Sequence, residues 1–94
     1  MKTRVEISKR AIKQINKAPK EIVESIAEWV LMLETIGLDQ TRKQGGVGLH
    51  DEALKGRLKD LRSIRLNRSW RLYYMEYRDE IVVVEIMRVD KHEY

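Results

Sequence analysis

Arginine occurs at every third position in the stretch RSIRLNRSWR, which runs from Arg62 to Arg71. A guanidinium group offers N–H donors in a planar fork and can hold two oxygens of one carboxylate or phosphate. It does not exchange protons near neutral pH, because its pKa exceeds about 12. These side chains could therefore bind an anion and stabilise its charge, while any proton transfer would need other residues.

The segment around these arginines is strongly basic. Between positions 42 and 71 the chain has nine cations and three carboxylates, whereas the net charge of the whole chain is only +4. The cations are Arg42, Lys43, Lys55, Arg57, Lys59, Arg62, Arg65, Arg68 and Arg71. A local excess of this size indicates a polyanionic partner. A charged surface that contacts only solvent explains this excess of cations equally well.

Composition limits the other kinds of chemistry. The chain has no cysteine, which excludes disulfides and thiolate metal sites. Its two histidines, His50 and His92, cannot form a zinc site without carboxylates. We therefore expect neither a metal nor another cofactor. The N-terminal segment is charged and has no apolar run, so we expect no signal peptide and no membrane span, and a cytoplasmic location.

The first part of the chain predicts a strand and a pair of helices. Residues 2–7 alternate polar and apolar side chains, as in a short strand. Ser8 is a suitable N-cap for a helix that carries Ala11, Ile12 and Ile15 on one face. Pro19 ends that segment. Residues 20–36 carry a broad apolar stripe, and Gly37 follows as a helix terminator, so we expect a helical hairpin with one apolar side.

The second part predicts a loop and three strands. Residues 38–50 contain three glycines, Gly45, Gly46 and Gly48, which we interpret as flexible loop and not as a nucleotide-binding motif. The strands are expected at 63–67, 70–77 and 80–89, the last two joined by a turn at Arg78 and Asp79. The apolar run at 81–84 is typical of a central strand.

The resulting order is β-α-α-β-β-β. We expect one α+β domain, residues 1–94, with the helical hairpin packed on one face of a mainly antiparallel, twisted sheet. On this assignment Arg65 points away from Ile64 and Leu66, and so away from the core. The C-terminal residues would leave the sheet beside Arg65 and Arg71, and together these groups would form one concave basic surface. The C-terminal members are Arg88, Lys91, His92 and Tyr94.

The segments LHDEALKG, RSIRLNRSWRLYY and IVVVEIMRVDKHEY together resemble the RelE/ParE toxin superfamily of bacterial type II toxin–antitoxin modules. The HigB-like and RelE-like mRNA interferases are the nearest branch, and the resemblance spans nearly the whole chain. It implies a compact RelE-like toxin that enters the ribosomal A site and cuts mRNA there. It also implies a cognate antitoxin, expected from an adjacent gene, that wraps the toxin and joins it in repressing their own operator DNA.

Cleavage of this type proceeds by attack of the 2′-OH on the neighbouring phosphate and needs a general base, charge stabilisation and a general acid, but no metal. His92 lies where the family places a catalytic residue, and an imidazole with a pKa near 6.5 can protonate the leaving 5′ oxygen. An exposed histidine without a function is the alternative. The base is harder to assign, and His50 and Lys55 are the candidates.

Further roles also come from the resemblance. Arg71 matches the arginine of the family's second strand and would hold the scissile phosphate, with a salt bridge to Glu76 or Glu85 as the structural alternative. Tyr94 could stack on a base or assist proton transfer. Lys55 and His50 match positions used for RNA contact or catalysis. The expected RNA- or phosphate-binding residues are Arg65, Arg57, Lys59, Arg62, Arg68, Arg88 and Lys91.

Two other functions are compatible with the same fold. A ParE-like toxin would inhibit DNA gyrase by binding alone, and it would leave the KHEY terminus without a role. A non-catalytic RNA-binding module would use the basic strands as a platform. Substitution of His92 by alanine separates these functions, because only an enzyme would lose activity while keeping its affinity for RNA.

Overall fold

The computed structural model of the chain describes residues 3–44 and 49–91. The predictions for His92, Tyr94, Gly45, Gly46 and Gly48 lie outside these residues. The helices are α1 (Lys9–Asn16), α2 (Lys20–Ile36) and α3 (Leu38–Gln44), with a short 3-10 turn, η1 (Gly56–Leu58). The strands are β1 (Thr3–Ile7), β2 (Leu49–Ala53), β3 (Arg62–Arg65), β4 (Trp70–Arg78) and β5 (Val82–Lys91).

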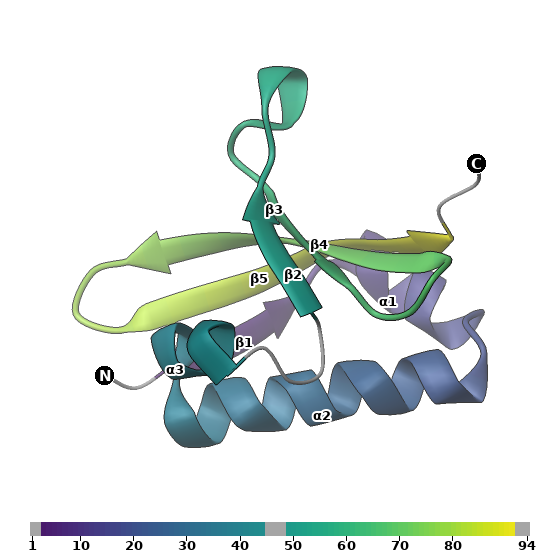
Figure 1. Ribbon diagram of the computed structural model, residues 1–94, viewed down its shortest axis with the longest axis horizontal. Helices are drawn as coiled ribbons and strands as arrows, with labels where there is room; N and C mark the ends of the chain where they lie inside the picture. The colour runs from purple at the N-terminus through teal and green to yellow at the C-terminus, as the bar shows by residue number, and fades with distance from the viewer. Residues whose placement is uncertain (1–2, 45–48, 92–94) are drawn as a thin grey trace.

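The five strands form one sheet in the order β1-β5-β4-β3-β2 (Figure 1). Strand β1 is parallel to β5, and the other three pairs are antiparallel. Helices α2 and α3 lie on one side of this sheet, and the connection between β2 and β3 rises on the other side (Figure 1). The predicted α+β fold with a mainly antiparallel sheet and a central last strand is confirmed.

Helix α2 supplies most of the helical half of the core. Its bounds are those predicted, because Pro19 fixes an extended backbone before it and Gly37 adopts a φ of 85° after it. The side chains of Ile22, Trp29 and Leu33 are buried against the sheet. The Trp29 ring packs on the Tyr74 ring with 5.2 Å between centroids, which fixes the helix over β4.

Helix α1 lies along the part of β5 that extends beyond β1. Ser8 caps the helix as predicted, since its hydroxyl accepts a hydrogen bond from the Ala11 N–H and donates one to the Met87 carbonyl. The Gln14 side-chain oxygen accepts from the Val89 N–H at 2.7 Å and so satisfies an edge group of β5. The prediction that Ile12 belongs to the buried face is wrong: its side chain is 46% exposed.

The prediction of a loop over 38–50 is wrong, because α3 occupies Leu38–Gln44 and β2 begins at Leu49. Helix α3 has no apolar period, and only Leu38 and Thr41 are buried. Its position is fixed by polar contacts: the Leu38 N–H donates to the Thr3 hydroxyl at 3.3 Å, and the Thr41 hydroxyl donates to the Gly37 carbonyl at 2.7 Å.

The other strands differ from the predicted ranges by a few residues. Strand β3 starts one residue earlier and is shorter than predicted, and β4 runs one residue further to Arg78. Strand β5 begins two residues later, at Val82, because Asp79 and Ile81 close the turn with a backbone hydrogen bond of 3.2 Å. Within the described residues, no helix is long and apolar enough to cross a membrane.

Candidate functional site

The side of the sheet that faces away from α2 carries two rows of polar side chains. Residues paired across neighbouring strands project to the same face. The register pairs Glu52 with Ser63, Ser63 with Tyr73, and Tyr73 with Arg88. These four residues form one row across β2, β3, β4 and β5.

The second row lies two residues along the strands and includes the two most central arginines. Arg65 on β3 pairs with Arg71 on β4, and Arg71 pairs with Asp90 on β5. Arg65 is exposed and Arg71 is half-buried. We call this surface the open face and define it by Glu52, Arg65, Arg71, Tyr73 and Arg88, with Ser63 buried between them.

The open face is electrostatically unsatisfied at its centre. Like charges directly opposite each other on neighbouring strands destabilise a sheet, and Arg65 and Arg71 are such a pair. The nearest carboxylate in register, Asp90, forms an ion pair with Arg88. Among the described residues, no carboxylate forms an ion pair with Arg65 or Arg71. A bound anion would relieve this repulsion.

The two carboxylates considered as salt-bridge partners of Arg71, Glu76 and Glu85, interact with other residues instead. Glu76 lies on the opposite face, where it pairs with Arg42 and Arg78. Glu85 accepts a hydrogen bond from the Tyr77 hydroxyl at 3.2 Å. Among the described residues the alternative salt bridge of Arg71 is thus not formed, and its phosphate-binding role stays a prediction.

Glu52 is not among the residues predicted from the sequence to form the site. It is the exposed carboxylate on the β2 end of the first row, and Arg65 is its diagonal neighbour on β3. Diagonal positions lie about 7–8 Å apart, which long side chains can bridge. A carboxylate that could accept a proton is thus available near Arg65 on this face. Assignment of 49–53 as a strand would have revealed it.

Tyr73 and Arg88 form the β5 end of the first row. The Arg88 guanidinium lies 5.2 Å from the centre of the Tyr73 ring, a cation–π contact. The same guanidinium is held by Asp90. Two partners fix Arg88 in place, so it contributes positive potential to the open face with little side-chain freedom.

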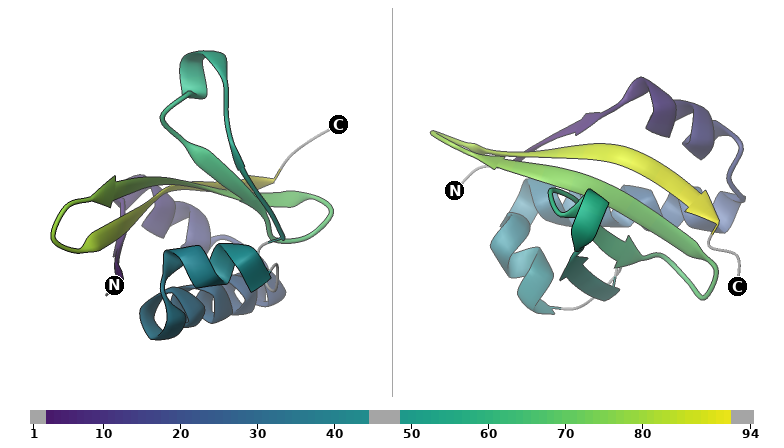
Figure 2. Two further views of the ribbon diagram at one scale, coloured as in Figure 1. Left: turned by 60° about the vertical axis from the view of Figure 1, so that its left-hand side comes forward. Right: turned by 90° about the horizontal axis from the view of Figure 1, so that it is seen from above.

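Three predicted cations lie on the connection between β2 and β3. Lys55 precedes η1, Arg57 lies within it and Lys59 follows it. All three are exposed, and this connection projects away from the sheet (Figures 1 and 2). Their position suits contacts with a large polyanion more than contacts with the centre of the open face.

His50 occupies an irregular position in β2. Its φ of 59° is the only positive value among the described non-glycine residues, and it falls where β2 has two residues opposite one of β3. This β-bulge turns Asp51 toward the helices and leaves Glu52 on the open face. His50 itself is exposed, and its predicted catalytic role stays a prediction.

The helix-covered side of β2 holds a compact ionic network around Asp51, whose side chain is only 7% exposed. Arg62 Nε donates to Asp51 Oδ1 at 2.7 Å, and the Tyr74 hydroxyl donates to Oδ2. Arg42 Nε lies 3.3 Å from Oδ2, outside hydrogen-bond geometry, while its Nη2 donates to the Tyr74 hydroxyl at 2.8 Å. The network ties α3 and β4 to β2 directly beneath Glu52.

Arg62 takes part in this ionic network and therefore has a structural role. Arg62 pairs in register with Tyr74, so its side chain lies on the opposite face from Arg65 and Arg71. Its guanidinium is held by Asp51. The convergence of Arg62 with the arginines of the open face is therefore not observed, and an RNA contact of this residue stays a prediction.

Tyr74 provides a test of the network in solution. Burial raises the pKa of Tyr74 well above its usual range, and its hydrogen bond to Asp51 acts in the same direction. The folded state thus prefers the protonated phenol, so this stabilisation is present below pH 10 or so and is lost as the pH rises through the folded-state pKa. We expect the tyrosinate absorbance to show one of the four tyrosines ionising only on alkaline unfolding.

The Tyr74→Phe variant should remove this late step and leave the ionisation of the other tyrosines unchanged. A titration in which all tyrosines of the wild-type protein ionise together near pH 10 would contradict the buried network.

The remaining predicted residues do not gather on the open face. Lys91 pairs with Trp70, on the side of the sheet that carries the core, although its own side chain is exposed. Arg68 is exposed in the turn between β3 and β4, where the Asn67 side chain accepts from two backbone N–H groups. The RNA contacts expected of Lys91 and Arg68 stay predictions.

The groups of the open face suit one type of chemistry. Arg65 and Arg71 can hold a phosphate and stabilise charge that develops on it, and Glu52 can accept a proton. Over the ranges 3–44 and 49–91, no cluster of histidine, aspartate and glutamate side chains could hold a metal ion. The arrangement supports binding of a phosphodiester and removal of a proton beside it.

The fold is similar to that of several solved toxin structures. One is the RelBE2 toxin–antitoxin complex from Mycobacterium tuberculosis, with 26% identity, a TM-score of 0.67, and coverage of 98% of this chain and 100% of that chain. The YoeB dimer from Staphylococcus aureus has 24% identity and a TM-score of 0.66, and covers both chains fully. The archaeal RelE–RelB complex from Pyrococcus horikoshii has 22% identity and a TM-score of 0.65, and covers 97% and 96% of the two chains. No protein-family model and no curated protein sequence matches the chain.

Proposed function

Because the chain has the fold of the RelE/ParE toxin superfamily, we propose that it is the toxin of a type II toxin–antitoxin module and that it cleaves mRNA on the ribosome. The single observation that supports the nuclease is the pairing of Arg65 with Arg71, neither of which forms an ion pair within residues 3–44 and 49–91, with Glu52 diagonal to Arg65 on the open face. A toxin that acted only by binding a protein would not require a proton acceptor next to a phosphate site.

The proposed reaction begins with the bound RNA. Glu52 removes the proton of the 2′-OH, and the resulting oxygen attacks the adjacent phosphorus in line. Arg65 and Arg71 stabilise the additional negative charge of the phosphorane with their N–H donors. The bond to the 5′ oxygen then breaks and leaves a 2′,3′-cyclic phosphate and a 5′-OH end.

The leaving 5′ oxygen must receive a proton. His92 is the proposed general acid, and Tyr94 is its proposed neighbour in this step, both on the basis of the family resemblance. Lys55 and His50 are kept as proposed RNA-contacting residues of β2 and its connection to β3. Because Glu52 now provides a base, neither of them is required for removal of the 2′ proton.

The cations outside the open face have a different proposed role. Lys55, Arg57 and Lys59 project from the sheet together and would contact ribosomal RNA or mRNA phosphates at a distance from the reacting bond. Such contacts weaken as salt displaces them. The ribosome and its mRNA place this activity in the cytoplasm, and an antitoxin that binds operator DNA together with the toxin completes the module.

Arg71 is the most direct test of the phosphate site. We expect Arg71→Ala to reduce the rate of cleavage of ribosome-bound mRNA by about 10²–10³-fold, because one preorganised donor to the phosphorane is lost. Arg71→Lys should recover part of the rate, since it restores the charge without the planar fork. The rate is measured on purified ribosomes programmed with a defined mRNA.

The matched control for this test is Arg10→Ala, which removes an exposed arginine from α1 and should not change the rate. Equal rates for Arg71→Ala and the wild type would refute the site. If the wild-type protein arrested growth while mRNA remained intact, a ParE-like action on DNA gyrase would replace the proposed nuclease.

A further inference from the structure

Strand β2 carries Glu52, the proposed proton acceptor, although its pairing in the sheet is irregular. It lies at the end of the strand order, with β3 as its neighbour. The register gives three pairs, interrupted by a bulge between Leu49 and Glu52. The φ of His50 within this bulge is 59°, a conformation that a non-glycine residue keeps only when its surroundings impose it. Backbone pairing alone therefore does not explain why Glu52 has one orientation.

The amino-acid pattern of β2 does not set its orientation either. Consecutive residues of a strand point to opposite faces, and a shift of one residue exchanges the faces. Burial of apolar side chains normally decides which face is covered, but the central residues of β2 are all polar: His50, Asp51 and Glu52. A shift of one residue would replace one carboxylate by the other on the helical side.

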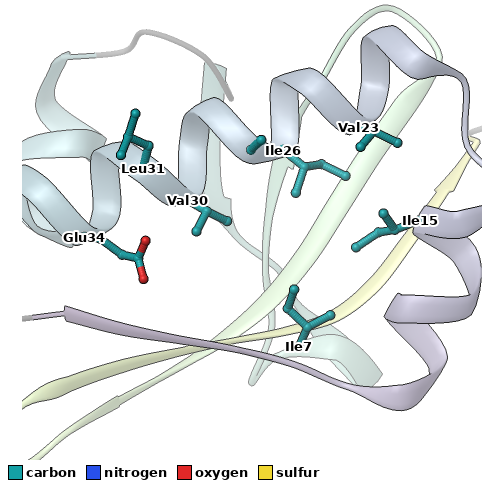
Figure 3. A pocket seen from close by; sticks show the side chains of 8 residues that line it. Ile7, Ile15, Val23, Ile26, Val30, Leu31 and Glu34 are labelled. Atoms are coloured by element: carbon teal, nitrogen blue, oxygen red, sulfur yellow. The ribbon is translucent and has the colours of Figure 1, made fainter.

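Strand β1, at the other edge of the sheet, provides the contrast. It pairs with β5 at five consecutive positions without a bulge. Thr3 is buried, and Val5 packs against the core. Ile7 points into an apolar groove that Ile15 of α1 and Ile26 of α2 also line (Figure 3). Burial thus holds alternate residues of β1 on the helical side, whereas the polar centre of β2 needs another means.

The carboxylate of Asp51 supplies this means, because both of its oxygens are held. Arg62 Nε donates to Oδ1 at 2.7 Å, and the Tyr74 hydroxyl donates to Oδ2. Arg62 Nη2 also donates to the backbone carbonyl of Asp51 at 3.4 Å, so one guanidinium holds the side chain and the main chain together. The Asp51 side chain is only 7% exposed. Hydrogen bonds to an ionised group are among the strong ones.

The donors to Asp51 belong to the inner strands of the sheet. Arg62 on β3 and Tyr74 on β4 are paired in register, and Tyr74 is fully buried. Arg42 on α3 forms ion pairs both with Asp51 and with Glu76 on β4. These anchored groups lie on one side of β2, so they fix the direction of the Asp51 side chain.

We propose that Asp51 is a positioning residue for the cleavage of mRNA, and that its contacts with Arg62 and Tyr74 hold Glu52 on the open face. The proposal rests on the proposed function, in which Glu52 accepts the 2′ proton. Because Asp51 and Glu52 are adjacent in a strand, fixing Asp51 on the helical side directs Glu52 to the other side, toward Arg65. Release of Asp51 lets β2 shift, and displacement of a catalytic group by about 1 Å can lower a rate 10²-fold.

Tyr74→Phe tests the proposal, because it removes one donor to Asp51 and keeps the buried ring. We expect it to lower the single-turnover rate of cleavage on programmed ribosomes by about 10-fold or more, with unchanged affinity for the ribosome. Asp51→Asn, which has the same shape but is a weaker acceptor, should lower the rate in the same way. Urea unfolding checks that each variant is folded under the assay conditions.

Tyr77→Phe is the matched control. It removes an exposed tyrosine hydroxyl from the same strand, one that donates to Glu85 and not to Asp51, and it should cleave as the wild type does.

A double variant separates positioning from a general loss of structure. In the Glu52→Gln background the group to be positioned is absent, so addition of Tyr74→Phe should not lower the remaining rate further. Loss of the same factor in both backgrounds, or a wild-type rate for both Tyr74→Phe and Asp51→Asn, would overturn the proposal.

Hydrogen exchange of the backbone amides separates this proposal from the proposed function, since it needs no activity. We expect the amides of β2 to exchange about 10-fold faster in Tyr74→Phe than in the wild type, while those of β5 stay unchanged. Unchanged exchange in β2 would overturn the role of Asp51. A wild-type protein that leaves ribosome-bound mRNA intact would refute the proposed function, and faster exchange in Tyr74→Phe would still assign to Asp51 the positioning of β2.

Discussion

Glu52→Gln is expected to reduce the rate of mRNA cleavage by about 10²–10⁴-fold, the usual contribution of a positioned general base. Glutamine has nearly the same shape as glutamate but cannot accept the 2′ proton, so the variant should bind ribosomes as well as the wild type does. The loss should therefore appear in the rate of the bound complex and not in its affinity. Single-turnover cleavage on programmed ribosomes measures the two separately.

Glu85→Gln is the matched control for Glu52→Gln. Glu85 pairs in register with Met75 on β4, on the same side of the sheet as the open face but outside its two rows, and its carboxylate interacts with Tyr77. We expect its removal to leave the rate unchanged. If Glu52→Gln cleaves at the wild-type rate, the base lies elsewhere, and His50 and Lys55 become the residues to test.

Asp51→Ala is expected to destabilise the protein by about 2–4 kcal/mol. The substitution leaves the Arg62 guanidinium and the Tyr74 hydroxyl without their shared acceptor and removes the carboxylate that forms an ion pair with Arg42, and removal of one partner of a buried ionic group is costly. The free energy of unfolding should fall by an amount near the lower end of this range. Arg42 and Arg62 are about one-quarter exposed, so water partly replaces the lost contacts. Urea unfolding followed by circular dichroism measures the change in free energy of unfolding.

Asp39→Ala provides the comparison for Asp51→Ala. Asp39 also pairs with an arginine, Arg78, and that contact lowers the pKa of its carboxyl, but the Asp39 side chain is 64% exposed. The stability of Asp39→Ala should therefore stay close to that of the wild type. An Asp51→Ala variant as stable as Asp39→Ala would show that the network under β2 does not hold the sheet together.

The elements with a strong periodic pattern were predictable from the sequence. Helix α2 carries its apolar stripe through many turns and is bounded by Pro19 and Gly37, so both its type and its ends were correct. Strand β5 has a run of apolar residues that only a central strand can bury, and it lies between β1 and β4. In both elements the pattern of apolar residues along the chain is enough to predict the structure, because burial of those residues determines it.

The elements held by polar contacts were not predictable in this way. Helix α3 depends on Thr3 and on the Arg42 network, and these partners are distant in sequence. Strand β2 contains a bulge at His50 and Asp51, which interrupts the alternation that would identify a strand. The position of Glu52 on the open face follows from that bulge, so the sequence pattern alone could not reveal it.

Strand alternation also decides which basic residues share a face of the sheet. Arg65 and Arg71 were correctly assigned to one surface, because their strand alternation is regular. Arg62 lies in the same strand as Arg65, but the two are three positions apart, an odd offset that places Arg62 on the opposite face with Asp51. In a strand, residues three positions apart lie on opposite faces, so the regular spacing of these arginines does not place them all on one face.

The most direct test of the central claim is primer extension on cellular mRNA after a brief pulse of expression, with the wild type beside Glu52→Gln and Arg71→Ala. We expect new cuts within translated codons for the wild type, with cyclic phosphate ends, and their loss in both variants while each protein remains folded. Cuts of equal intensity in all three samples would show that the open face does not carry out the cleavage, and intact mRNA with the wild type would contradict the nuclease itself.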